Sequence, residues 1–188
     1  HDFEIAVHPD IPWWTGNCSN LPLNMYDLRT TLLHEFIHGV GILSTIHADK
    51  SAMPVIYDLQ LRDAYGEPVV HGDEFQGEFG QPLYVNNVRV YNPPEFQPGS
   101  SFAHYEQSGV MGYAQNSREC TRHIDHGVVR LLNSIGYNCT SGYRTIHMEG
   151  QDFILIIIGV AVVVIGFVAC ACSSISSKKP RGKRPLLA

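Results

Sequence analysis

Apolar residues recur at roughly helical spacing between residues 24 and 40, and they predict an amphipathic helix there. Asn24 is a favoured N-cap residue, and Asp27 three positions later resembles a capping box. Gly41 can end the helix in a left-handed conformation. The apolar stripe of this helix comprises Leu28, Leu32, Leu33, Phe36, Ile37 and Val40.

A second amphipathic helix is predicted over residues 123–135, where the apolar stripe ends at Gly136. Residues 2–8 alternate instead, which is typical of a strand. The apolar positions of that strand are Phe3, Ile5 and Val7. Trp13 and Trp14 follow in a predicted loop, where they could belong to the core or to a substrate cleft, and a core position is the favoured interpretation.

Residues 44–103 show no sustained period. Short apolar runs at residues 54–59 and 82–85 indicate isolated strands or turns, and prolines between residues 93 and 98 mark a loop. A long irregular segment within a compact domain is usually functional or disordered, and its aromatic content argues against disorder. We therefore expect an ordered insertion with a functional role.

The chain becomes strongly apolar near its C-terminal end. Residues 153–172 contain no charged side chain and are long enough to cross a bilayer as one helix. Basic residues follow at once, and they place the tail on the cytoplasmic side; they are Lys178, Lys179, Arg181, Lys183 and Arg184. This pattern predicts an outside domain (1–139), a linker (140–152), the membrane span (153–172) and a basic cytoplasmic tail (173–188).

The predicted location is therefore the plasma membrane or another membrane of the secretory pathway, with the domain outside. Such a topology needs a signal segment, and none precedes His1, so we expect a processed or fragmentary ectodomain. Cys170 and Cys172 lie at the inner membrane face, where palmitoylation and an unmodified state are both open. The 188 residues carry a net charge of -5 without a strongly basic surface in the first part, which makes nucleic acid an unexpected partner.

An outside location also allows disulfides and glycans. Cys120 and Cys139 are the preferred pair, closing a short loop around the last helix, while Cys18 could take either partner or a cysteine outside this sequence. Asn17 and Asn138 each begin an N-glycosylation sequon.

His34, Glu35 and His38 form an HExxH signature inside the first predicted helix. Positions four apart on a helix lie about 40° apart around the axis and about 6 Å along it, so both imidazoles can reach one metal ion. Glu35 is rotated by about 100° from His34 around the helix axis. This position does not suit a metal ligand, but it suits a residue that holds a water bound to the metal. A catalytic zinc needs a third protein ligand from elsewhere in the chain.

These residues, together with Gly41, resemble the extended motif of the metzincin metalloproteases. The position of the third histidine in that motif is Ser44, and this departure is similar to the leishmanolysin-type branch, in which a long insertion precedes a distant histidine. His104 is then the implied third ligand, and residues 109–113 resemble the Met-turn, with Met111 beneath the metal. Tyr113 stands where some metzincins keep a tyrosine beside the zinc, although core packing is an equal alternative.

The resemblance implies an α+β zinc-peptidase domain made of a zinc helix, an irregular insertion, a Met-turn and a C-terminal helix. It also implies a Zn²⁺ cofactor, a protein or peptide substrate, and hydrolysis by zinc-activated water with Glu35 as general base. Few residues precede the zinc helix, so the N-terminal half-domain of the family is expected to be reduced or missing. An inactive surface adhesion or interaction module with this fold is the alternative.

Other residues compete for the role of third ligand. His47 is near enough in sequence, and a carboxylate such as Glu74 or Asp125 would make a different class of zinc peptidase. His71, His123 and His126 are expected to be solvated or hydrogen-bonded surface residues, and His1 and His8 have no site context.

Overall fold

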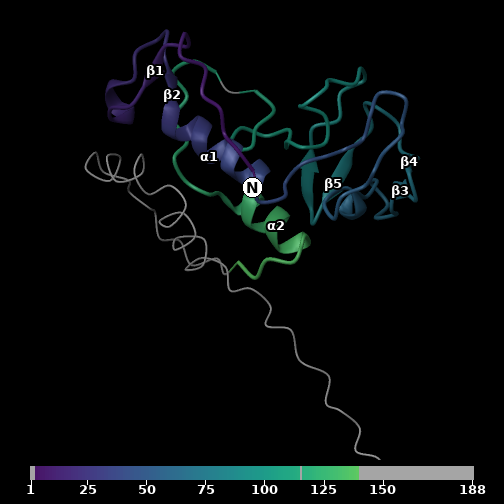
Figure 1. Ribbon diagram of the computed structural model, residues 1–188. Helices are drawn as coiled ribbons and strands as arrows, with labels where there is room; N and C mark the ends of the chain where they lie inside the picture. The colour runs from purple at the N-terminus through teal and green to yellow at the C-terminus, as the bar shows by residue number, and fades with distance from the viewer. Residues whose placement is uncertain (1–2, 115, 140–188) are drawn as a thin grey trace, which may run out of the picture.

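The computed structural model describes residues 3–114 and 116–139 (Figure 1). The predicted linker, membrane span and tail, with Cys170 and Cys172, lie outside the described residues. Within the described ranges, no helix combines the length and the apolar character that crossing a bilayer requires.

The described residues form two α-helices, two short 3₁₀-helices and three two-stranded sheets, arranged as in Figure 1. The helices are α1 (Leu28–Gly39) and α2 (His126–Ser134), and the 3₁₀-helices are η1 (Cys18–Asn20) and η2 (Asp58–Gln60). The strands are β1 (Trp13–Trp14) parallel to β2 (Tyr26–Asp27), then the antiparallel pairs β3 (Val70–His71) with β4 (Glu74–Phe75) and β5 (Leu83–Val85) with β6 (Val88–Val90).

α1 begins at Leu28, later than predicted, because Asp27 is its N-cap. The Asp27 carboxylate accepts a hydrogen bond from the Thr30 backbone N–H at 2.9 Å. Asn24 lies in a turn before β2, so its predicted role as N-cap is wrong. Pairing of Tyr26 and Asp27 with β1 keeps this part of the chain extended and delays the helix. The predicted stop is confirmed, since Gly41 has a φ of +117°.

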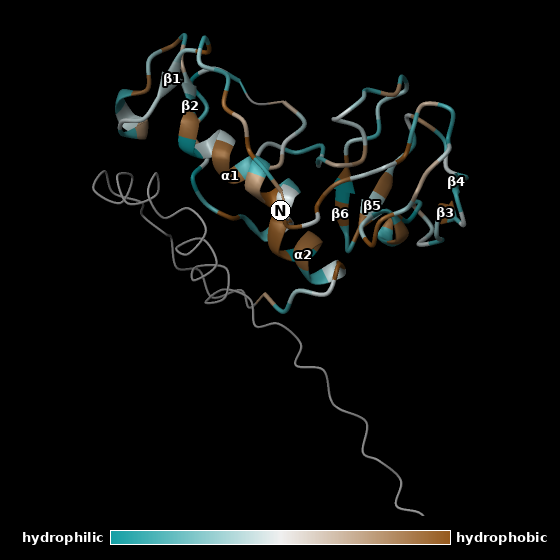
Figure 2. Cartoon of the chain, viewed as in Figure 1, coloured by the Kyte–Doolittle hydropathy of each residue, from teal (hydrophilic) through white to brown (hydrophobic). Residues whose placement is uncertain are grey.

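α2 is also shorter than predicted at its start. Asp125 caps it through a 3.0 Å hydrogen bond from the Val128 N–H, and Gly136, with a φ of +106°, follows its end. The helix carries both hydrophobic and hydrophilic residues (Figure 2), and its Val128 and Leu131 are fully buried. They share one core with residues of α1, of the hairpins and of the segment around residue 110.

The insertion is ordered around two buried side chains. The Asp58 carboxylate accepts hydrogen bonds from the Thr45 N–H, the Thr45 hydroxyl and the Val55 N–H. Tyr57 donates its hydroxyl to the Phe102 carbonyl at 2.9 Å. Residues 54–59 therefore turn about Asp58, so a turn is the correct one of the two structures predicted for them, whereas residues 82–85 contain the strand β5.

The N-terminal segment also differs from its prediction. Residues 3–8 run along α1 without pairing in a sheet, so the predicted strand is wrong (Figure 1). Trp13 and Trp14, expected in a loop, form β1.

A buried ion pair joins the start of α1 to residues 118–122. Arg122 donates from Nε to Asp27 at 2.8 Å and from Nη2 to the second Asp27 oxygen and to the Gly16 carbonyl. The Thr121 N–H donates to the Thr30 hydroxyl at 2.9 Å. These bonds place two distant parts of the chain side by side.

The disulfide follows from that placement. Cys18 pairs with Cys120 across 102 residues, so the predicted pairing of Cys120 with Cys139 is wrong. α2, about 13 Å long, lies between Cys120 and Cys139 in the chain, and Cys139 is held beyond it by a 2.7 Å hydrogen bond from its N–H to Asn133. Closing so long a loop stabilises a fold by about 4–5 kcal/mol in the chain-entropy estimate.

We expect Arg122→Met to lower the free energy of unfolding by about 3–5 kcal/mol, because it leaves a buried carboxylate without its partner. Urea denaturation followed by circular dichroism measures this change. Arg89→Met is the matched control, since Arg89 pairs with Glu106 in a half-exposed ion pair and about 1 kcal/mol or less is expected there. Equal losses in the two variants would contradict the structural role of the buried pair.

The same pair predicts a dependence on pH. Burial by itself raises the pKa of Asp27, but hydrogen bonds from Arg122 and Thr30 outweigh it and the folded-state pKa is lowered. Such a carboxylate stabilises the fold above its unfolded pKa of about 3.9, and the contribution is lost as the pH falls through the lower folded value. The stability advantage of wild type over Arg122→Met should therefore shrink below about pH 4, measured by urea denaturation across the acid range. An advantage that stays constant down to full protonation would contradict it.

Candidate metal centre

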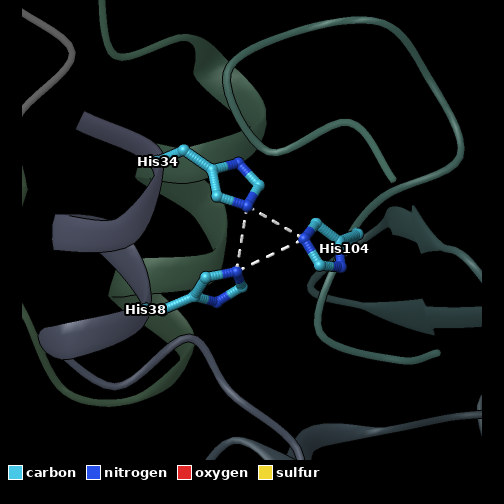
Figure 3. Close-up of side chains that lie close together, drawn as sticks. All are labelled: His34, His38 and His104. Carbon is cyan, nitrogen blue, oxygen red and sulfur yellow. Dashed lines mark hydrogen bonds between the residues drawn. The ribbon is translucent and has the colours of Figure 1, made fainter. Parts of the chain in front are cut away.

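Three imidazoles from distant parts of the chain meet at one point (Figure 3). His34 and His38 project from α1, and His104 comes from the segment that follows β6. The Nε2 atoms are separated by 3.1 Å between His34 and His38, 3.0 Å between His34 and His104, and 3.3 Å between His38 and His104. The predicted grouping is therefore present in the structure.

Each of these rings is oriented by a backbone carbonyl. The Nδ1 atom of His34 lies 2.6 Å from the Val110 oxygen, that of His38 lies 2.6 Å from the Ile42 oxygen, and that of His104 lies 2.9 Å from the Ser100 oxygen. A carbonyl only accepts hydrogen bonds, so each Nδ1 carries the hydrogen. In the neutral ring, Nε2 then holds a lone pair.

Three lone pairs therefore converge on one point. They cannot hydrogen-bond to one another, and without a cation they repel. Tetrahedral zinc with Zn–N distances of about 2.0–2.1 Å needs nitrogens about 3.3 Å apart, which is close to the observed separations. A carbonyl on the second nitrogen is the usual way in which a protein orients a ligating imidazole. The three histidines thus fit a metal ion and leave a fourth coordination position.

Burial favours the neutral, ligating form of two of the rings. It lowers the pKa of His104 to about 4 and also lowers the pKa of His38. Metal ligation requires the deprotonated nitrogen. These two imidazoles are therefore available to a metal throughout the neutral range.

The segment before His104 holds a strained conformation. Phe102 has a φ of +68°, which is rare for a bulky residue. Its N–H donates to the Tyr91 carbonyl at 2.8 Å, its carbonyl accepts from the Tyr57 hydroxyl, and its ring is fully buried. Strain held by its surroundings in this way often marks a functional site, and here it precedes the third histidine by two residues.

The predicted Met-turn is tied directly to this segment. Met111 is fully buried, and its carbonyl accepts a 3.0 Å hydrogen bond from the N–H of Tyr105, the residue after His104. The Tyr105 hydroxyl in turn hydrogen-bonds to Asp125, the cap of α2. The carbonyl that orients His34 belongs to Val110, next to Met111. Two of the three imidazoles thus depend on one tightly bonded segment.

Glu35 is exposed on α1 and shares the lining of an open groove with His38. Tyr113 is 46% exposed, and its ring stacks on Tyr91 with centroids 4.1 Å apart. Its hydroxyl has no hydrogen bond within the described part of the chain. The predicted sequon residues Asn17 and Asn138 are both exposed.

The residues considered as alternative third ligands lie outside the histidine cluster. His47 is exposed and outside the histidine cluster. Glu74 is exposed on β4, and Asp125 is engaged as the cap of α2. The carbonyls of Ile42, Ser100 and Val110, in contrast, were not anticipated, because the sequence carries no signal for which backbone oxygen will face a given ring.

Comparisons with models of protein families, with curated proteins and with solved structures find no match to this chain.

We expect the folded wild-type domain to bind about one zinc ion per chain, and His104→Ala to weaken binding by far more than the 10–100-fold typical of changes around the ligands. His47→Ala is the matched control, because it removes an exposed histidine outside the cluster. Competition with a chromophoric chelator measures both affinities, with circular dichroism as the check on folding. Loss of zinc in His47→Ala, with retention in His104→Ala, would overturn this ligand set.

Proposed function

We propose that this domain is a zinc-dependent peptidase that hydrolyses peptide bonds. The single observation that carries the proposal is the convergence of three Nε2 lone pairs, from His34, His38 and His104, with an exposed glutamate directly after the first of them. Three histidine ligands and an open fourth position are typical of catalytic rather than structural zinc.

The zinc ion would supply Lewis-acid chemistry, polarising the scissile carbonyl and acidifying the attacking water. The chain's own part is to hold the ion and to move the proton. The Glu35 carboxylate is the group that accepts the proton from the water and returns it to the leaving amine.

The surroundings of Glu35 suit that role. Its carboxylate makes no hydrogen bond to another residue in the described ranges, so both oxygens are free to accept a proton. It is exposed to the groove that His38 also lines. A purely structural metal site has no use for a free carboxylate in this position, whereas a hydrolase needs one.

We expect Glu35→Gln to retain zinc and to lose peptidase activity by at least about 100-fold, the lower end of general-base contributions. Hydrolysis of a quenched fluorescent peptide library, with metal content measured in parallel, tests this. Glu74→Gln is the matched control, because Glu74 is an exposed carboxylate remote in sequence from the histidines, and it should keep full activity.

Equal activity in wild type and Glu35→Gln would remove Glu35 from the mechanism. A zinc-loaded wild type without any activity would favour the adhesion or interaction module instead.

A further inference from the structure

An open groove of about 440 Å³ lies between the N-terminal segment and α1. Residues 3–8 and Ile11 form one wall, while Leu32, Glu35 and His38 belong to the helix side. The groove thus reaches the proposed base and one of the proposed ligands. Trp13 also lines it, although a core position was the favoured prediction for that residue.

The wall is attached to the helix next to the histidines. The Phe3 ring packs edge-on against Phe36, with centroids 5.7 Å apart. It also covers Gly39, where a Cβ atom would lie 2.6 Å from the ring. Only glycine at that position allows the close approach, so the residue directly after His38 provides the seat for the N-terminal segment.

The backbone of the wall is available to a ligand. Within the described residues, no N–H or carbonyl of residues 3–7 makes a hydrogen bond. An extended segment with unpaired backbone groups is a template for an extended peptide, which can pair with it through main-chain hydrogen bonds. This feature favours a peptide over a small apolar ligand as the occupant.

The wall also exposes large apolar side chains to the groove. Val7 is 44% exposed and Ile11 is 37% exposed, and both face one groove together with Leu32. Single exposed apolar residues are ordinary, but several that share one concavity mark an interaction site. A groove of this size accepts a short stretch of peptide rather than one side chain alone.

We propose that Val7 and Ile11 determine substrate specificity by selecting peptides with a large apolar side chain close to the bond that is cleaved. The placement near that bond rests on the proposed peptidase function, because Glu35 and His38 line the same groove. The selection itself is a binding property. A polar side chain placed against the aliphatic residues Val7, Ile11 and Leu32 would lose its contact with water there.

The test compares two capped pentapeptides that differ only in a central leucine or serine, with binding measured by isothermal titration calorimetry. All proteins carry Glu35→Gln, so that the peptides persist. We expect the leucine peptide to bind at least about tenfold more tightly. Val7→Asn with Ile11→Asn should abolish this preference. Ile56→Asn with Leu59→Asn is the matched control, since both residues are exposed aliphatics outside the groove.

Loss of the leucine preference in the groove variant alone supports the proposal. Equal affinity of the two peptides for the parent protein, or an unchanged preference in the groove variant, overturns it. If the preference depends on the groove but the wild type cleaves neither peptide, the specificity assignment stands and the proposed peptidase function fails. The two ideas are thus separated by one set of measurements.

Discussion

The position of α1 depends on one buried carboxylate. Asp27 ends β2, caps the helix through Thr30 and binds Arg122, which also holds the Gly16 carbonyl. A carboxylate that is fully removed from water is tolerated only when nearly all its hydrogen-bonding capacity is used. The direction of the helix is therefore coupled to the segment around residue 122, and the Cys18–Cys120 disulfide reinforces the same junction.

The histidine cluster of the candidate metal centre is held in place by backbone carbonyls rather than by an ion pair. Each ring of the cluster is oriented by a carbonyl outside α1: Ile42 for His38, Ser100 for His104 and Val110 for His34. The sixty or so residues between Gly41 and His104 add little loop-closure entropy compared with a short connection. Buried Tyr57 and Asp58 hold this insertion through hydrogen bonds, and the segment that carries His104 is bonded to Tyr57 through the Phe102 carbonyl.

The sequence predicted the parts of this structure that depend on short-range pattern. The spacing of His34 and His38, the stop at Gly41 and the strand β5 all follow from local periodicity or from backbone freedom. The capping-box pattern of Asn24 and Asp27 predicts too early a start for α1, because Asp27 is the N-cap itself. The composition of residues 54–59 suits either a strand or a turn, and the hydrogen bonds of the buried Asp58 carboxylate favour the turn.

The pairing of the disulfide could not be predicted from the sequence for a related reason. Cys120 and Cys139 are near in sequence, yet the ion pair between Asp27 and Arg122 brings Cys18 to Cys120 instead. His104 could be anticipated only through its resemblance to a known motif, and the carbonyls that aim the rings could not be anticipated at all. What unites these cases is that a polar contact across many residues decides the local conformation.

The two polar centres have opposite energetics, and this difference bears on how the domain folds. Asp27 and Arg122 neutralise each other within the chain, so the junction they form is complete without a ligand. The three Nε2 lone pairs repel one another, so their convergence is unfavourable until a cation binds. A ligand that binds only the folded arrangement stabilises it. The Asp27 junction therefore fixes one end of α1 without any ligand. A bound metal would stabilise the packing of His104 and of the turn around Met111 against the remainder of the same helix.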